Sequence, residues 1–440
     1  MAFFLLAVFA VLAAIEGTWA VEIHSHWSFI VLTLLAIFLL GAEAAGDFRH
    51  KRTVPLLSHA GLLLVLAGGL LGAAGLTDVT IQVAEGRSES VAIDSDGGLV
   101  HLPWEVSLHK FTIDYYEDGT RAKQYTSELE IGGKTLKTSV NHPARYKGWR
   151  IYQSCWGEGY SVLKLVRNPW LALLLLGALL LVSGAALSLA GAWSGRKILV
   201  PALVLAAVFS AISIARINFG ALPPALRSLW FAPHLAAYML AYAILALSLL
   251  SGIGSTFSGR IPEGLTHRLL TTAQSGLLIG MICGAVWAQQ AWGSYWSWDP
   301  KECWAAATWA LTLAASGAPL KCKRLALTLI ILAFLAMNVT WYGINYLPSS
   351  TVSMHTYNRA NPALALYEHH PGRSFYMNGN TICGGGALRS RTLSQNLCPN
   401  CRRTRHDSVS QDNCLPFRKY AKNCLTFEII SASEMDRIRI

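Results

Sequence analysis

Long apolar runs separated by short polar connections dominate the first 342 residues of the chain. Uninterrupted runs of about 17–25 apolar residues are typical of helices that cross a bilayer. The pattern predicts such spans at residues 27–45, 56–75, 170–191, 198–215, 235–251, 269–288, 304–320 and 325–342. A shorter run from Ala2 to Ile15 lacks the basic start of a signal peptide, so we interpret it as a truncated or shallow first span. We therefore expect an α-helical polytopic membrane protein with about eight or nine spans.

Between residues 77 and 168 the period of the pattern falls to two. Val79, Ile81 and Val83 alternate with polar residues, and glycine-containing turn sequences separate stretches of this kind. This predicts a small antiparallel β-rich domain inserted between membrane helices. The expected division of the chain is membrane helices at 1–76, the β-rich domain at 77–168, a second membrane domain at 169–362 and a basic tail at 363–440.

The tail has neither a spanning run nor a coherent period, and we interpret it as disordered. It holds five of the nine cysteines, including the Cys-x₂-Cys pair Cys398 and Cys401. Zinc sites usually need a second pair at a suitable spacing. Cys414 and Cys424 do not form one, so we do not favour a metal site there.

Composition supports the membrane assignment. Charged residues make up 14% of the chain and hydrophobic residues 53%, whereas soluble proteins contain about 25% charged residues. Nine cysteines are too few for a disulfide scaffold. The net charge of +11 does not indicate nucleic-acid binding, because basic residues of membrane proteins accumulate in cytoplasmic loops.

The basic clusters also predict an orientation. They fall in alternate connections: Arg49, Lys51 and Arg52; Arg196 and Lys197; Arg260 and Arg268; Lys321, Lys323 and Arg324. If all four lie in the cytoplasm, the connections outside it are 76–168, 216–234, 289–303 and 343–360. The β-rich domain is then extracytoplasmic.

One extracytoplasmic connection, the tryptophan loop (residues 292–304), is dense in aromatic residues. It carries Trp292, Gly293, Trp296, Trp298, Asp299, Pro300, Glu302 and Trp304. Interfacial belts scatter tryptophan over both membrane boundaries, so this crowding favours a binding platform for a large planar apolar ligand. Asp299, Pro300 and Glu302 also resemble a capping box, which leaves each acid open to being a helix-start residue or a ligand contact.

Three histidines are candidates for ligand binding. His59 alone lies within a predicted span, where an ionisable group suggests function; the alternative is a neutral histidine bonded to a neighbouring helix. His234 begins a helix and His355 follows the last span, both on the side of the tryptophan loop. Two imidazoles flanking an aromatic platform are suited to ligating haem iron from both faces.

These segments resemble a known family. The tryptophan loop resembles the WWD motif of haem-handling proteins in cytochrome c biogenesis, and the segments around His234 and His355 are similar to its two flanking histidine segments. The segments around His59 and at 141–154 resemble the partner subunit, ResB/CcsB. Over roughly residues 27–360 the chain thus resembles a fused CcsB–CcsA, or System II, cytochrome c synthase.

The resemblance implies a holocytochrome c synthase (haem lyase) in a bacterial-type inner membrane. Such a protein takes up haem b from the cytoplasmic side and attaches it, outside, to the Cys-x-x-Cys-His segment of apocytochrome c. The resemblance assigns His59 as the first intramembrane histidine and His234 and His355 as the external iron ligands. It assigns the platform to Trp292, Gly293, Trp296, Trp298, Asp299, Glu302 and Trp304. The expected partners are apocytochrome c, haem and the lipid bilayer, with no nucleic acid.

Two features depart from the family. Its second intramembrane histidine corresponds to Gly317, for which nearby Cys322 is a disfavoured substitute, and its final span is replaced by the tail. These departures bear on synthase activity more than on haem binding, so a non-catalytic haem exporter or haem-delivery protein stays open. A membrane cytochrome is disfavoured, because only His59 lies within a span. We interpret Asn141 and His142 as a structured turn of the β-rich domain.

Overall fold

The structure is a computed structural model of the 440-residue chain. It describes residues 2–193, 199–215, 222–258, 263–318 and 322–355, and two short strands, β9 (Met377–Asn378) and β10 (Thr381–Ile382), which pair antiparallel. Residues Met1–Ser374 form one compact unit and Phe375–Ile440 a second. These two strands lie in the tail for which we predicted disorder; the rest of the tail, including the Cys398–Cys401 pair, falls outside the described residues.

The first unit is built mainly from helices that follow the predicted apolar runs. The described residues contain α1 (Ala2–Trp19), α2 (Trp27–Arg49), α3 (Thr53–Gly75), α4 (Leu171–Trp193), α5 (Leu199–Ala215), α6 (Phe231–Ile253), α7 (Glu263–Trp292), α8 (Pro300–Ser316) and α9 (Lys323–Trp341). Among them, α2, α3, α4, α6, α7 and α9 are long and apolar enough to cross a membrane. The prediction of a polytopic helical membrane protein is confirmed. The apolar helices α1, α5 and α8 are shorter, at 17 or 18 residues each.

Short helical turns connect several of these helices. They are η1 (Ile23–Ser25), η3 (Pro224–Leu226), the π-helical η4 (Gly254–Ser258), η5 (Gly343–Tyr346) and η6 (Pro348–Val352). Two helix boundaries differ from the prediction near the candidate site. α7 continues to Trp292, so that this residue ends a helix rather than beginning a loop, and α6 begins at Phe231 rather than at 235.

The predicted β-rich domain is an eight-stranded antiparallel sheet. Its strands are β1 (Thr77–Ala84), β2 (Ser88–Asp94), β3 (Leu99–Tyr115), β4 (Ala122–Ile131), β5 (Lys134–Ser139), β6 (Ala144–Tyr146), β7 (Trp149–Gly157) and β8 (Tyr160–Arg167). They lie in the order β5-β4-β3-β2-β1-β8-β7-β6. Val79 and Ile81 pair with Leu165 and Leu163 of β8, and all four are buried, as the two-residue period requires.

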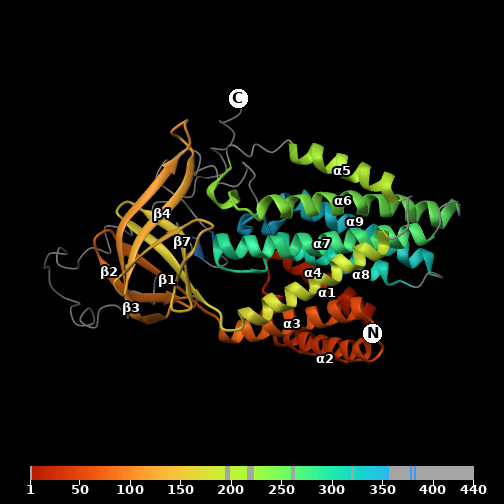
Figure 1. Ribbon diagram of the computed structural model, residues 1–440, viewed down its shortest axis with the longest axis horizontal. Helices are drawn as coiled ribbons and strands as arrows, with labels where there is room; N and C mark the ends of the chain where they lie inside the picture. Colours follow the sequence, from red (N-terminus) through yellow and green to blue (C-terminus); the bar gives the residue numbers. More distant parts are fainter. Residues whose placement is uncertain are drawn as a thin grey trace, which may run out of the picture. The chain divides into compact units, whose positions relative to one another are not determined.

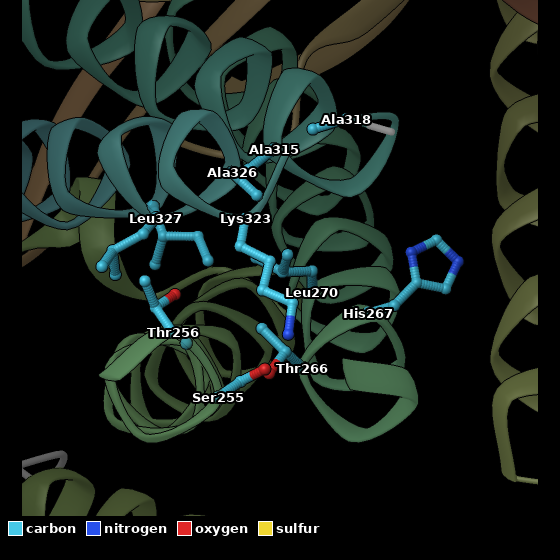
Figure 2. A pocket seen from close by; sticks show the side chains of 12 residues that line it. Ser255, Thr256, Thr266, His267, Leu270, Ala315, Ala318, Lys323, Ala326 and Leu327 are labelled. Atoms are coloured by element: carbon cyan, nitrogen blue, oxygen red, sulfur yellow. The ribbon is translucent and has the colours of Figure 1, made fainter. Parts of the chain in front are cut away.

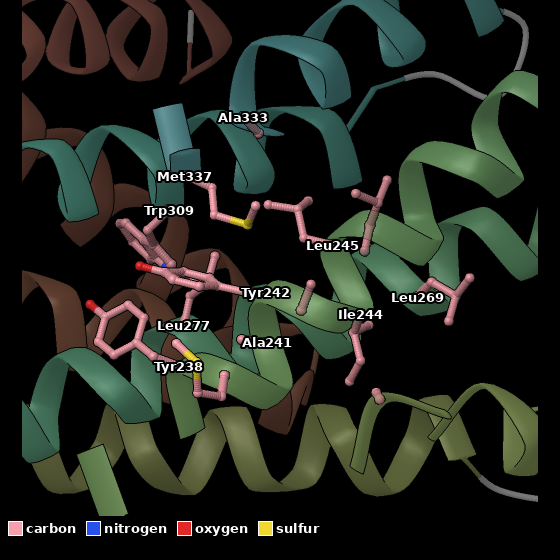
Figure 3. Packing of buried hydrophobic residues seen from close by; sticks show 14 of the residues in the cluster. Tyr238, Ala241, Tyr242, Ile244, Leu245, Leu269, Leu277, Trp309, Ala333 and Met337 are labelled. Atoms are coloured by element: carbon pink, nitrogen blue, oxygen red, sulfur yellow. The ribbon is translucent and has the colours of Figure 1, made fainter. Parts of the chain in front are cut away.

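Close helix crossings hold the membrane part together. A Cβ at Gly61 of α3 would lie 2.8 Å from the backbone nitrogen of Leu181 in α4, and one at Gly177 would lie 2.9 Å from the carbonyl oxygen of Gly61. Small residues permit such a close approach. The van der Waals contacts that result drive helix association in lipid, where there is no hydrophobic driving force between helices. α6 packs side by side with α7 and with α9 (Figure 1). Tyr238 and Tyr242 lie near Trp309 of α8 in the core that these helices form with α8 (Figure 3).

Hydrogen bonds attach the sheet to connections of the second membrane domain. Asn141, in the turn after β5, donates from Nδ2 to the carbonyl oxygen of Pro224 at 2.8 Å. Tyr116 donates from its hydroxyl to Leu222 at 2.8 Å, and Gln289 of α7 donates to the hydroxyl of Tyr152 in β7. The sheet therefore contacts the helix ends that carry the tryptophan loop.

Candidate functional site

The start of α8 has the capping box that the sequence predicted. Asp299 is the N-cap and accepts from the Lys301 N–H at 2.9 Å, while Glu302 accepts from the Asp299 N–H at 3.2 Å. Pro300 stands at the first helical position, where its missing N–H costs nothing. Both acids are therefore helix-start residues, and Asp299 has a further role.

Asp299 also binds the segment that follows α9. Its carboxylate accepts from Ser353 Oγ at 3.0 Å, from the Met354 N–H at 2.7 Å and from His355 Nδ1 at 3.0 Å. A carboxylate bound to Nδ1 fixes the orientation of an imidazole and leaves Nε2 as its ligating nitrogen. Asp299 thus joins the helix start to His355.

The two groups perturb each other's proton affinity. Burial alone lowers the pKa of His355, but the charge of Asp299 and its hydrogen bond outweigh burial and raise that pKa above the ordinary value. Burial likewise acts to raise the pKa of Asp299, and the charge of His355 together with the hydrogen bonds to the carboxylate lowers it overall. Each group therefore stabilises the charged form of the other.

His234 lies in the first turn of α6 and is oriented by α7. Its Nδ1 donates to the carbonyl oxygen of Gly280 at 2.9 Å, which again leaves Nε2 for a ligand. A Cβ at Gly284 would lie 2.7 Å from His234 Nδ1. The imidazole therefore occupies space that only glycine leaves open on α7.

Trp287, a residue that the sequence reasoning did not select, contacts both histidines. Its ring centroid is 5.7 Å from that of His234 and 5.8 Å from that of His355. Trp292 packs 5.2 Å from Trp287 and 5.3 Å from His355. Trp287 donates from Nε1 to the carbonyl oxygen of Ala225 at 2.8 Å. The structure thus gathers His234, His355 and Trp292 around a single buried indole.

The rest of the tryptophan loop faces other elements. Trp298 meets Trp296 edge to face at 5.9 Å, and it contacts the chain between α1 and α2. Trp304 lies against Gly17 of α1. Gly293 has a φ of +83°, and a Cβ there would lie 3.1 Å from the Tyr152 ring. Gly293 therefore serves the contact between loop and sheet, and the predicted platform divides into two parts.

His59 lies apart from this group, near the start of α3, whereas the sheet follows the other end of that helix. Its Nδ1 donates to Asp47 Oδ2 at 2.7 Å, and Arg52 pairs with Asp47 Oδ1 at 2.7 Å. Asp47 is 1% exposed, whereas the His59 side chain is 35% exposed. His59 is thus bonded to a neighbouring helix, as the alternative interpretation proposed, but its partner is a carboxylate.

Gly317 is the C-cap of α8 and donates its N–H to Leu313. Close to it, between α6, α7, α8 and α9, is a cavity of about 50 Å³ whose lining includes Ala315, Ala318 and Lys323. Figure 2 shows the Lys323 side chain extending toward Thr266 while the His267 ring points away. Cys322 is exposed, at the N-cap of α9.

Sequence reasoning missed Trp287 and Asp47, and it missed His24, which stacks on Trp298, together with Glu16, which contacts His24. Trp287 gave a signal, since it is a tryptophan at the end of a predicted span, just before the tryptophan loop. Asp47 also gave a signal, because it is an acidic residue close in sequence to the basic cluster at Arg49–Arg52. The contact between Glu16 and His24 depends on how α1 packs, which the local sequence does not reveal.

Two family models match adjacent regions of the chain. The ResB-like family matches residues 44–161, and the cytochrome C assembly protein family matches residues 168–352. The chain is a fused ResB-like and cytochrome c assembly protein. The predicted resemblance to the CcsB–CcsA type is thereby confirmed.

Curated relatives match parts of the fusion. It is 36% identical over 129 residues to the cytochrome c biogenesis protein CcsA of Chlamydomonas reinhardtii, covering 26% of the fusion and 36% of that protein. It is 35% identical over 122 residues to CcsB of Synechococcus sp. (strain JA-3-3Ab), covering 26% and 25%. It is 31% identical over 179 residues to CcsA of Parasynechococcus marenigrum (strain WH8102), covering 31% and 57%. The fusion therefore matches between a quarter and just over half of the length of these relatives.

Proposed function

We propose that the fusion acts in cytochrome c biogenesis, carrying haem b across a bacterial-type inner membrane and attaching it to a Cys-x-x-Cys-His segment of apocytochrome c. Both family regions stand in one polypeptide, and the names of its relatives point to this process. The observation that carries the proposal is the arrangement of His234 and His355 beside Trp287, each with its Nδ1 already bonded.

Haem enters this proposal as the substrate. Two imidazole Nε2 atoms suit axial ligation of its iron, and the indoles of Trp287 and Trp292 suit contact with a planar apolar ring. Attachment adds each cysteine S–H across a vinyl group, so that sulfur bonds to one vinyl carbon and the proton goes to the other. The protein then contributes mainly by holding both reactants in register. Bringing the reactants together in the correct orientation removes a large part of the barrier in such reactions.

The two ends of the helices suit uptake and attachment. His59 and Asp47 lie near the basic residues that we assign to the cytoplasmic face, and the β-rich domain and the tryptophan loop are assigned to the extracytoplasmic face. A second candidate function is haem delivery without attachment. Gly317, which stands where the family has a histidine, favours it, because glycine offers no ligand at that position.

The test is co-expression with an apocytochrome c reporter in cells that lack their own maturation system. The wild type is expected to yield covalently bound haem on the reporter, and His234→Ala and His355→Ala are expected to abolish it and to shift the spectrum of haem on the purified fusion. External imidazole is expected to restore part of the yield. His101→Ala, an exposed residue of β3, serves as the control.

Each alternative outcome is distinct. Haem that accumulates on the fusion but never on the reporter supports delivery alone. Unchanged spectra in both histidine variants contradict the ligand assignment.

A further inference from the structure

Trp298 is held by a part of the chain that precedes both matched family regions. The His24 ring stacks on its indole, with centroids 4.8 Å apart and planes 7° from parallel. Phe29 meets the same indole edge to face at 5.3 Å. Both belong to the N-terminal hairpin, which consists of α1, η1 and the first turn of α2 (residues 2–30). One face of Trp298 is therefore covered, and the hairpin determines which part of the indole is accessible to a ligand.

A buried carboxylate orients His24. Glu16, in the last turn of α1, is 4% exposed, and its Oε1 lies 2.5 Å from His24 Nδ1. An acid at the end of an apolar helix is costly unless it is partnered, so this contact gives Glu16 a physical reason to be there.

α1 is fixed to the helix that carries the capping box. A Cβ at Gly17 would lie 2.7 Å from Trp304 Cδ1 and 2.9 Å from the carbonyl oxygen of Pro300, so α1 lies directly against the start of α8 (Figure 1). Ser349 donates to the Gly17 carbonyl oxygen at 2.6 Å. Ala10 and Ala13 continue this contact against Ala307 and Ala310. The Glu16–His24 pair is thus anchored to the start of α8, which also carries Asp299.

The backbone at Trp298 explains why such support is needed. Its φ of +56° lies in the left-handed region, which bulky residues adopt only when their surroundings enforce it. The following residue is Asp299, whose carboxylate holds His355. Release of the Trp298 side chain would let this backbone relax and would displace the carboxylate that orients a proposed iron ligand.

We propose that Glu16 and His24 are positioning residues, which hold Trp298 and, through it, Asp299 and His355 in the geometry needed for haem attachment. This inference rests on the proposed function. It makes the N-terminal hairpin, which lies outside residues 44–352, a component of the extracytoplasmic haem site.

The test separates stacking, hydrogen bonding and folding. His24→Ala removes the stack and the bond, His24→Phe keeps an aromatic ring on Trp298, and Glu16→Gln keeps an acceptor for Nδ1 without the charge. His26→Ala is the matched control for a local disturbance of the hairpin, because the His26 ring caps α2 through the Ser28 N–H and packs on Trp27, not on Trp298. Each full-length variant is co-expressed with the reporter, and its own bound haem is examined by visible and electron paramagnetic resonance spectroscopy.

Misplacement of a reacting group by about 1 Å can cost about 100-fold, so we expect His24→Ala to lower the covalent-haem yield by about 10-fold at an unchanged protein level. Its bound haem should stay six-coordinate, with shifted resonance positions that report a reoriented His355. Glu16→Gln should retain most of the yield and His26→Ala all of it, whereas His24→Phe, which keeps the ring but leaves Glu16 unpaired, should be intermediate between the wild type and His24→Ala.

The inference is overturned if His24→Ala matures the reporter like the wild type, or if His24→Phe and His26→Ala lose as much activity as His24→Ala. In both cases the wild type still attaches haem and the proposed function stands. If the wild type attaches none, the proposed attachment fails, and the resonance shift of His24→Ala alone decides whether the pair positions the site. A wild type that takes up no haem contradicts both proposals.

Discussion

Asp47 and Asp299 each bond to Nδ1 of a histidine, yet their surroundings differ. Asp47 shares its carboxylate between His59 and the half-exposed cation of Arg52, and the His59 side chain is 35% exposed. Asp299 binds a serine hydroxyl and backbone N–H groups besides His355, whose side chain is only 14% exposed. The open pair suits a ligand that must arrive and leave, and the enclosed pair suits one that is held for reaction.

The enclosed pair should be the more costly one to break. Asp299→Ala removes a helix cap and leaves buried N–H groups and His355 without their acceptor. We expect a loss of at least about 2 kcal/mol in the free energy of unfolding and no covalent haem on the reporter. Thermal unfolding in detergent measures the first effect. Asp299→Asn, which keeps the cap, should recover most of the stability; equal melting temperatures for Asp299→Ala and the wild type would contradict this account.

Crowding of His234 should have the next largest effect. In Gly284→Ala the new methyl group would overlap the imidazole, which must then move away from Gly280. We expect about a tenfold lower yield of covalent haem, because a small displacement at a reacting site is costly. Gly69→Ala is the control, since a Cβ there meets nothing within 4 Å, and it should be neutral or slightly stabilising.

A pH series sharpens the contrast through His355. Since its pKa is raised above 6.5, a proton competes with iron for Nε2, and haem binding at this site should weaken as pH falls through that pKa. Asp299→Asn should move this loss to lower pH. Spectral titration of haem on the purified variants measures both midpoints, and an unshifted midpoint would remove Asp299 as its cause.

The same pair predicts the stability of the haem-free protein. The raised pKa of His355 contributes stability that is complete below 6.5 and disappears as pH rises through the folded value. The lowered pKa of Asp299 contributes stability that is complete above 3.8 and disappears as pH falls through its folded value. The contribution is therefore greatest between these two limits, and melting temperatures of wild type and Asp299→Asn should differ most there.

The open pair should tolerate change best. Arg52→Ala removes a partner whose side chain is 54% exposed, while Asp47 is 1% exposed and keeps its bond to His59. We expect about twofold less haem on the fusion and a smaller loss of stability than in Asp299→Ala, because the lost cation is partly solvated. His59→Ala should reduce haem content further, and a larger effect from Arg52→Ala than from His59→Ala would reverse the proposed roles.

Periodicity predicted the architecture well because it acts locally. The apolar runs placed the helices, the alternation at Val79, Ile81 and Val83 placed the first strand, and the spacing of Asp299, Pro300 and Glu302 predicted a helix start. The start of α6 and the end of α7 were misplaced, because polar or aromatic residues such as Trp292 interrupt an apolar run without ending the helix.

The site was predicted only in part. His234 and His355 were placed on one side by topology, but Trp287, which links them, lies in a helix whose rotation depends on packing against α6. The partners of His59 and His24 were also missed, since Asp47 and Glu16 approach them only through the way in which helices cross. The chemistry of a residue is visible in sequence, whereas its neighbours are set by the tertiary structure.

The ring of Tyr152 stands where a side chain at position 293 would have to be, and Gln289 bonds to the same tyrosine. Tyr152 lies in the ResB-like region and the other two lie in the cytochrome c assembly region. Inheritance on one polypeptide fixes the ratio of these regions at one to one and passes both surfaces on together. Chimaeras that exchange one region between fused proteins should therefore work best when this tyrosine and this glycine travel from the same parent.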